Sequence, residues 1–173
     1  MFPVSIRKCG RRFVWMLLAI GCFAAVALAQ DIGNCTSHDP STRPDCPDAI
    51  VFFQKLQAAV KAGDKAQLAS MVNFPLRTSQ HGQRVRIRNW QQFLQAYSQV
   101  FTPQVICAVE AAKPSDVWGN YQGFMVGQGV IWWDQIIPAS VKNPQPDSGK
   151  YPFKIIAVNN QDVSVPGCTK DKP

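Results

Sequence analysis

One stretch of the sequence, residues 117–135, constrains the fold more than any other. It contains three of the five tryptophans and four of the eleven glycines, and its apolar residues alternate with polar ones. Alternation with a period of two is typical of β-strands, and glycine permits the tight geometry of turns and bulges. The stretch therefore predicts strands at residues 117–121, 123–126 and 130–134. Large aromatic side chains at this density need to be buried, so we expect residues 117–135 to form the centre of the core.

The residues before this stretch follow a helical pattern. Apolar side chains recur at steps of three and four in four segments, residues 48–62, 65–72, 90–101 and 103–112. Residues 74–78 and 84–87 flank a polar turn and predict a hairpin, and residues 151–158 predict a last strand. Helices first and strands afterwards indicate the α+β class, with N-terminal helices packed on a curved antiparallel sheet.

The first 29 residues have the layout of an export signal. Four basic residues precede an apolar run at 13–28, and Ala27-Leu28-Ala29 has the form of a cleavage site. We expect a signal peptide cleaved near Ala29, a periplasmic or secreted mature protein, and no integral membrane segment after its removal. In the alternative reading, Cys22 is the lipidated first residue of an anchored lipoprotein.

Removal of this segment changes the charge balance. The whole chain has 18 basic and 11 acidic residues, and the four basic residues of the signal leave 14, a net charge of +3. The alkaline character of the chain therefore belongs largely to its targeting segment. A nucleic-acid partner loses its main support, and we expect none.

Four cysteines remain in the mature chain. In an exported protein this number indicates two disulfides, of which proximity in sequence favours Cys35–Cys46 and leaves Cys107–Cys168, although three pairings are possible. Zinc is the competing use of such residues, but no Cys-x-x-Cys or paired histidine motif is present. We expect no metal and no cofactor. The chain then divides into an irregular, disulfide-pinned leader at 30–47, one domain at 48–168 and a tail at 169–173.

Four segments together resemble a known superfamily. They are Phe74-Pro75-Leu76, residues 90–101, the run GFMVGQGVIWW at 123–133 and the run FKIIAVN at 153–159. In this order they are similar to the nuclear transport factor 2-like cone fold, shared with the ketosteroid isomerase and SnoaL-like families. The chain looks most like small exported bacterial proteins of that superfamily, whose function is unassigned. The resemblance implies a cone fold over about residues 48–160.

The isomerase branch of this superfamily suggests one kind of chemistry. There an acidic residue inside the cone acts as a base, often with a pKa tuned by an apolar pocket. The candidates for such a base in this chain are Asp134, Asp116 and Glu110, and a solvated or capping role competes with catalysis at each. His38 and His81 have no cysteine or acid at nucleophile or metal spacing, and no hydrolase, phosphate-loop or dinucleotide motif occurs.

Two groups of side chains are candidates for binding. Arg84, Arg86 and Arg88 alternate along a predicted strand with Arg77 opposite them, so their charges share one face and suit an anionic partner. A solvated strand face that discourages edge pairing is the alternative. Four rings, Trp118, Tyr121, Trp132 and Trp133, are candidates to line a ligand cavity or an interface. Core packing is the competing role and the default for at least half of these rings. Alternation sends the adjacent Trp132 and Trp133 to opposite faces, so one of the two must enter a second packed layer, line a pocket or be exposed.

Three functions follow as hypotheses. The first is an exported, non-enzymatic domain that binds a small apolar ligand or a protein partner. The second is an isomerase or dehydratase with Asp134 or Asp116 as its base. The third is an inhibitor or immunity protein that caps an exported enzyme through the arginine strand. The position of the two carboxylates, inside or outside a closed apolar cavity, discriminates between them.

Overall fold

A computed structural model describes residues 45–142, 149–161 and 163–168. The chain divides into two units, Met1–Gln30 and Asp31–Pro173, and every described residue belongs to the second. The predicted signal peptide, its cleavage site near Ala29, the alternative anchor Cys22 and the leader residue Cys35 lie outside the described residues. None of the described helices combines the length and the apolar character needed to cross a membrane.

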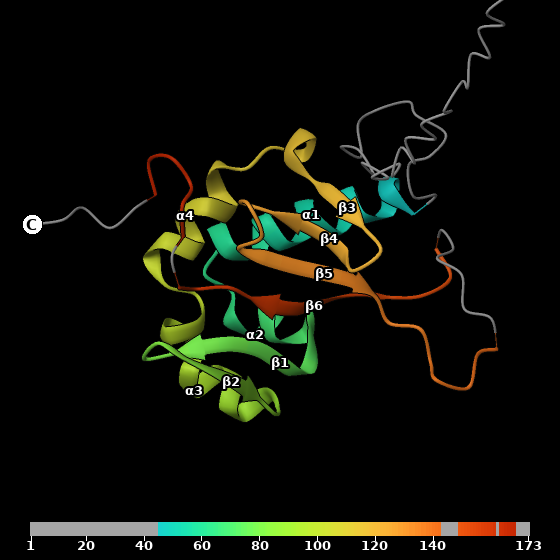
Figure 1. The fold of residues 1–173 in the computed structure, drawn as a ribbon, viewed down its shortest axis with the longest axis horizontal. Coiled ribbons are helices and arrows are strands. Elements are labelled where there is room, and N and C mark those ends of the chain that lie inside the picture. Colours follow the sequence, from blue (N-terminus) through green and yellow to red (C-terminus); the bar gives the residue numbers. More distant parts are fainter. Residues whose placement is uncertain (1–44, 143–148, 162, 169–173) are drawn as a thin grey trace, which may run out of the picture. The chain divides into compact units, whose positions relative to one another are not determined.

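The structure is α+β, with helices on one face of a six-stranded sheet (Figure 1). Helix α1 spans Cys46–Lys61, beginning two residues before the predicted start, and α2 spans Lys65–Ser70. Asp64 caps α2 as its side chain accepts a hydrogen bond from the Gln67 amide at 2.9 Å. The buried side of α1 is the predicted stripe of Phe52, Phe53, Leu56, Ala59 and Val60.

Helix α3, at Trp90–Val100, begins after the N-cap residue Asn89. The Asn89 side chain accepts from the Gln92 amide at 3.0 Å, and the Gln92 side chain accepts from the Arg88 amide at 2.8 Å. Helix α4 follows at Pro103–Ala111, capped by Thr102. A single 3₁₀ turn, η1 at Pro114–Asp116, leads from the helices into the sheet.

The sheet has the order β2-β1-β6-β5-β4-β3. Its strands are β1 Val72–Gln80, β2 Gln83–Ile87, β3 Trp118–Asn120, β4 Gly123–Val126, β5 Ile131–Gln135 and β6 Phe153–Val158. The prediction of a purely antiparallel sheet is wrong, because β1 and β6 pair in parallel. Every antiparallel pair joins two consecutive strands of the chain, whereas β1 and β6, the first and last strands, are separated by all the others in sequence. Alternation within a strand carries no information on such a pairing.

The core lies between the sheet and the helices and is filled by rings. Trp133 of β5 is fully buried, stacked on Phe53 of α1 and on Phe124 of β4, with ring centroids 6.1 and 6.3 Å apart. Phe52 lies 6.1 Å from the same indole. Among the described residues, the Trp133 indole Nε1 has no hydrogen-bond partner, so packing alone holds this ring.

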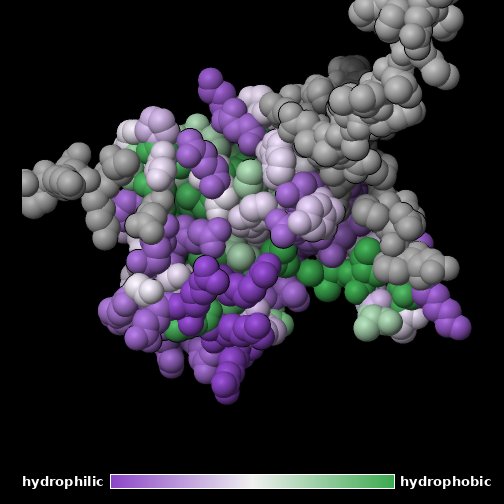
Figure 2. Space-filling view, viewed as in Figure 1, coloured by the Kyte–Doolittle hydropathy of each residue, from purple (hydrophilic) through white to green (hydrophobic). Residues whose placement is uncertain are grey.

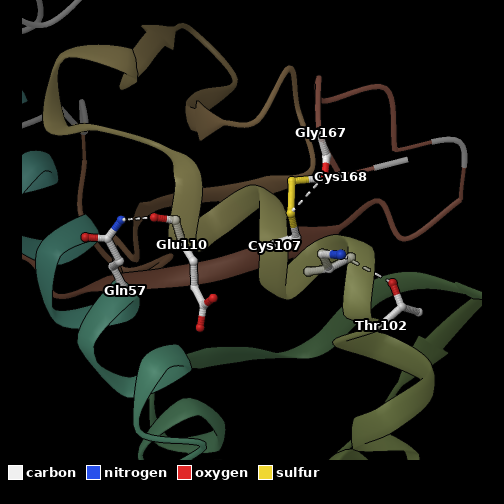
Figure 3. The surroundings of a disulfide bond; sticks show 7 residues. Gln57, Thr102, Cys107, Glu110, Gly167 and Cys168 are labelled. Carbon is white, nitrogen blue, oxygen red and sulfur yellow. Dashed lines mark hydrogen bonds between the residues drawn. A yellow bond between two sulfur atoms is a disulfide. The ribbon is translucent and has the colours of Figure 1, made fainter. Parts of the chain in front are cut away.

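Two links fasten α4 to the rest of the domain (Figure 3). A disulfide joins Cys107 of α4 to Cys168, 61 residues later. The Gln57 side-chain amide of α1 donates to the Glu110 carbonyl at 3.3 Å, as drawn in Figure 3, and also to the carbonyls of Val109 and Ala112 at 2.9 and 2.8 Å, which satisfies the end of α4. Cys46 is also disulfide-bonded, and its predicted partner Cys35 lies outside the described residues.

Candidate functional site

One row of directly opposed residues crosses all six strands of the sheet. From β3 to β2 its members are Trp118, Met125, Trp132, Ala157, Arg77 and Arg86. Directly opposed residues in a sheet point to the same face. Since Trp133 points into the core, its neighbour Trp132 and the whole row lie on the outer face, away from the helices.

A groove of about 620 Å³ lies over part of this row. Side chains that line it include Arg77, Ser79, Arg84, Arg86, Gln122, Trp132, Ala157 and Asn159. We call it the Arg–Trp groove. Figure 2 shows the outer face, with strongly hydrophilic side chains gathered over β1 and β2. The groove joins the predicted arginine strand to one of the predicted rings.

The register of the sheet positions Arg77 in the groove. Between Trp132 and Trp133 the pairing of β5 with β6 skips one residue, which leaves Ile156 as an extra residue in β6. Its carbonyl accepts a hydrogen bond from Arg77 Nε at 3.5 Å. This contact ties the Arg77 side chain to β6, the strand that lies between β1 and the β5 residue Trp132. Such bulges re-aim side chains and occur often next to functional sites.

The groove is strongly cationic. Arg77 and Arg86 are directly opposed on β1 and β2, and Arg84 follows two residues along on the same face. No carboxylate is among the described residues that line the groove. Like charges placed directly opposite each other destabilise a sheet. A bound anion would relieve this repulsion.

The other end of the groove is aromatic. Trp132 is half-buried, and its indole lies against Gly129, where a Cβ atom would sit 3.2 Å from Nε1. Gly129 has a φ of +88°, which suits glycine, and its carbonyl accepts from the Asn159 amide at 2.6 Å. The turn before β5 is thereby fixed, and part of the indole stays accessible from the groove.

Asn160 secures the wall of the groove on the β1 side. Its side chain exchanges hydrogen bonds with the Ser79 backbone, accepting from N at 3.2 Å and donating to O at 2.8 Å. The same amide donates to the carbonyl of Gln99 in α3. The end of β1 is therefore held against both β6 and the helical layer.

The structure separates the other predicted binding residues from the groove. Trp133 was a wrong choice for binding, because its ring is enclosed by the core. Trp118 belongs to the outer row but lies on the edge strand β3, and Tyr121 is 83% exposed in the turn after β3. Arg88 follows β2 and lines a neighbouring hollow with Pro75, Val85 and Arg86, of which Val85 and Arg86 also line the groove, whereas Arg88 does not. Gln122, Ala157 and Asn159 also line the groove, and no sequence pattern singled them out.

The candidate bases also lie elsewhere. Asp116 caps η1, where its Oδ2 accepts from the Lys113 amide at 2.8 Å, so it is a structural carboxylate. Asp134 lies on the outer face opposite Lys154, and its Oδ1 accepts from the Gln135 amide at 2.9 Å. Glu110 is exposed on α4. These three positions differ from the buried cone carboxylate that the resemblance implies.

Burial raises the pKa of Tyr97, a residue of α3 outside the groove. Its ring stacks on Phe101 with centroids 5.4 Å apart. The phenol therefore stays neutral at pH 7 and contributes packing rather than charge.

The chemistry available in the groove is that of binding. Guanidinium groups pair with oxyanions, and an indole face stacks on flat apolar groups. No histidine, cysteine or carboxylate is among the lining residues, and the described part of the chain has no cluster of three such residues able to hold a metal ion. No protein-family model, curated protein or solved structure matches the chain, so its function is inferred from this site.

Proposed function

We propose that this protein is an exported, non-enzymatic cone-fold domain that binds an anionic ligand through the Arg–Trp groove. The observation that carries the proposal is the outer row, in which two directly opposed arginines lie beside Ala157 and Trp132. Export rests on the N-terminal signal pattern, and the cone fold on the sequence resemblance together with helices on one face of the sheet.

A charged ligand on the outer face fits better than an apolar ligand inside the cone. The space between helices and sheet is occupied by Trp133, Phe53 and Phe124, all fully buried. The groove instead offers three guanidinium groups, which favour carboxylate or phosphate groups. The isomerase alternative loses support, since Asp116 caps a turn and Asp134 faces outward.

Titration with inorganic phosphate tests this proposal. In two-dimensional NMR spectra we expect the Trp132 indole N–H signal and the signals of β1 and β2 to shift. Arg77→Gln is expected to lower the affinity for phosphate about tenfold or more. A hydrogen bond to a charged group contributes about 1.5–3 kcal/mol, and about 1.4 kcal/mol corresponds to a factor of ten in affinity.

Arg88→Gln is the matched control, because it removes the same charge from the same hairpin but outside the groove. We expect less than a twofold change in affinity for this variant. Equal losses in the two variants would mean that net charge, and not the groove, attracts the anion. Phosphate that shifts no groove signal at high millimolar concentration would contradict the proposed function.

A further inference from the structure

We infer that the ligand of the Arg–Trp groove is a small dianion attached to a flat ring, such as a phosphate monoester of an aromatic compound. This inference rests on the proposed function of the same groove and names its ligand class. It joins two features that lie side by side on the outer face, a cationic end and an aromatic end.

The charge of the groove selects a dianion. Directly opposed residues on antiparallel strands have Cα atoms about 4.5–5.5 Å apart, so the Arg77 and Arg86 side chains can reach one oxyanion together. Arg84, on the same face, adds a third cation. A phosphoryl group presents three oxygens to these guanidinium groups, whereas a single carboxylate presents two oxygens and carries half the charge.

The floor of the groove selects a flat extension of that dianion. Ala157 lies between Arg77 and Trp132 in the row, one strand from each, or about 4.8 Å per step. Its methyl group leaves a low floor between the guanidinium and the indole. A ring bonded to the phosphoryl group can lie over Ala157 and stack on Trp132, a contact that inorganic phosphate cannot make.

The size of the groove favours a small molecule over a macromolecular segment. Its volume of about 620 Å³ lies within the range of small-ligand sites, roughly 300–1,000 Å³. The amides of Gln122 and Asn159 add polar contacts at its margin. An acidic protein segment is the competing ligand and provides one arm of the test.

Calorimetric titration of the exported, disulfide-intact protein tests the inference with four probes: phenyl phosphate, inorganic phosphate, benzyl alcohol and a deca-glutamate peptide. We expect phenyl phosphate to bind at least tenfold more tightly than inorganic phosphate, and benzyl alcohol and the peptide to bind more weakly than phenyl phosphate. Trp132→Leu and Ala157→Ile should each bring phenyl phosphate to the affinity of inorganic phosphate. Both affinities are measured on the same variant, so an overall change in anion binding does not enter the comparison. Both replace outer-face residues, and isoleucine favours a strand, so thermal unfolding should show that both variants fold.

The failures of the two proposals are distinguishable. If the wild-type protein binds phenyl phosphate and inorganic phosphate with equal affinity, the inferred contact between a ligand ring and Trp132 is wrong. The proposed anion binding by the Arg–Trp groove would still hold. If deca-glutamate binds more tightly than phenyl phosphate, and its affinity is unchanged in Trp132→Leu, the ligand is an acidic protein segment and the inference of a small ligand is wrong. Absence of binding by every anion would overturn the proposed function, and the inference with it.

Discussion

Trp133→Ala is expected to lower the free energy of unfolding by about 3–5 kcal/mol, the usual cost of truncating a buried large ring to alanine. The indole of Trp133 is fully enclosed and stacks on Phe53 and Phe124. Its removal leaves a cavity whose rigid aromatic walls come from both a helix and the sheet. Urea denaturation monitored by circular dichroism measures the effect.

Trp132→Ala is the matched control, since it removes the same side chain from the adjacent position on the opposite face. Trp132 is only half-buried, so we expect a loss of less than half that of Trp133→Ala. Similar losses in the two variants would contradict the assignment of Trp133 to the core and Trp132 to the groove.

Removal of the disulfide is the second large effect. Replacing both Cys107 and Cys168 with serine is expected to cost about 4 kcal/mol, because the bond closes a loop of 61 residues and so restricts the unfolded chain. The measurement is urea denaturation of the double variant beside the wild-type protein, both without reductant. Phosphate affinity should stay within twofold, because neither cysteine lines the groove.

A stability loss below 1 kcal/mol in this double variant would contradict the loop-closure argument. It would mean that packing of the C-terminal segment, including the partly buried Val163 and Val165, holds residues 163–168 in place without the bond.

The helices were predictable from the sequence because their signals are local. Asn89 followed by Gln92, and Thr102 followed by Pro103, are caps whose partners lie within four residues. The face taken by each of Trp132 and Trp133 was not predictable, although alternation required that they differ. That choice depends on the rings of α1, about 80 residues earlier, which stack on Trp133.

The groove was predictable only in part, for the same reason. The shared face of Arg84 and Arg86 follows from the period of a strand. Their proximity to Trp132 depends on β6 lying between β1 and β5, and on the parallel pairing of β1 with β6. The contact of Arg77 with the Ile156 carbonyl spans 79 residues and depends on a register shift that no local pattern encodes.

The most direct test of the account is the variant Arg86→Glu. It turns a like-charge pair with Arg77 into an opposite-charge pair, so the free energy of unfolding should rise by about 0.2–1 kcal/mol. The same change removes one anion-binding group and adds a repulsive one, so inorganic phosphate should bind at least tenfold more weakly. A more stable protein with a weakened site is the result that we predict. Unchanged phosphate affinity, or a loss of stability, would contradict the claim that these arginines are held together to bind an anion.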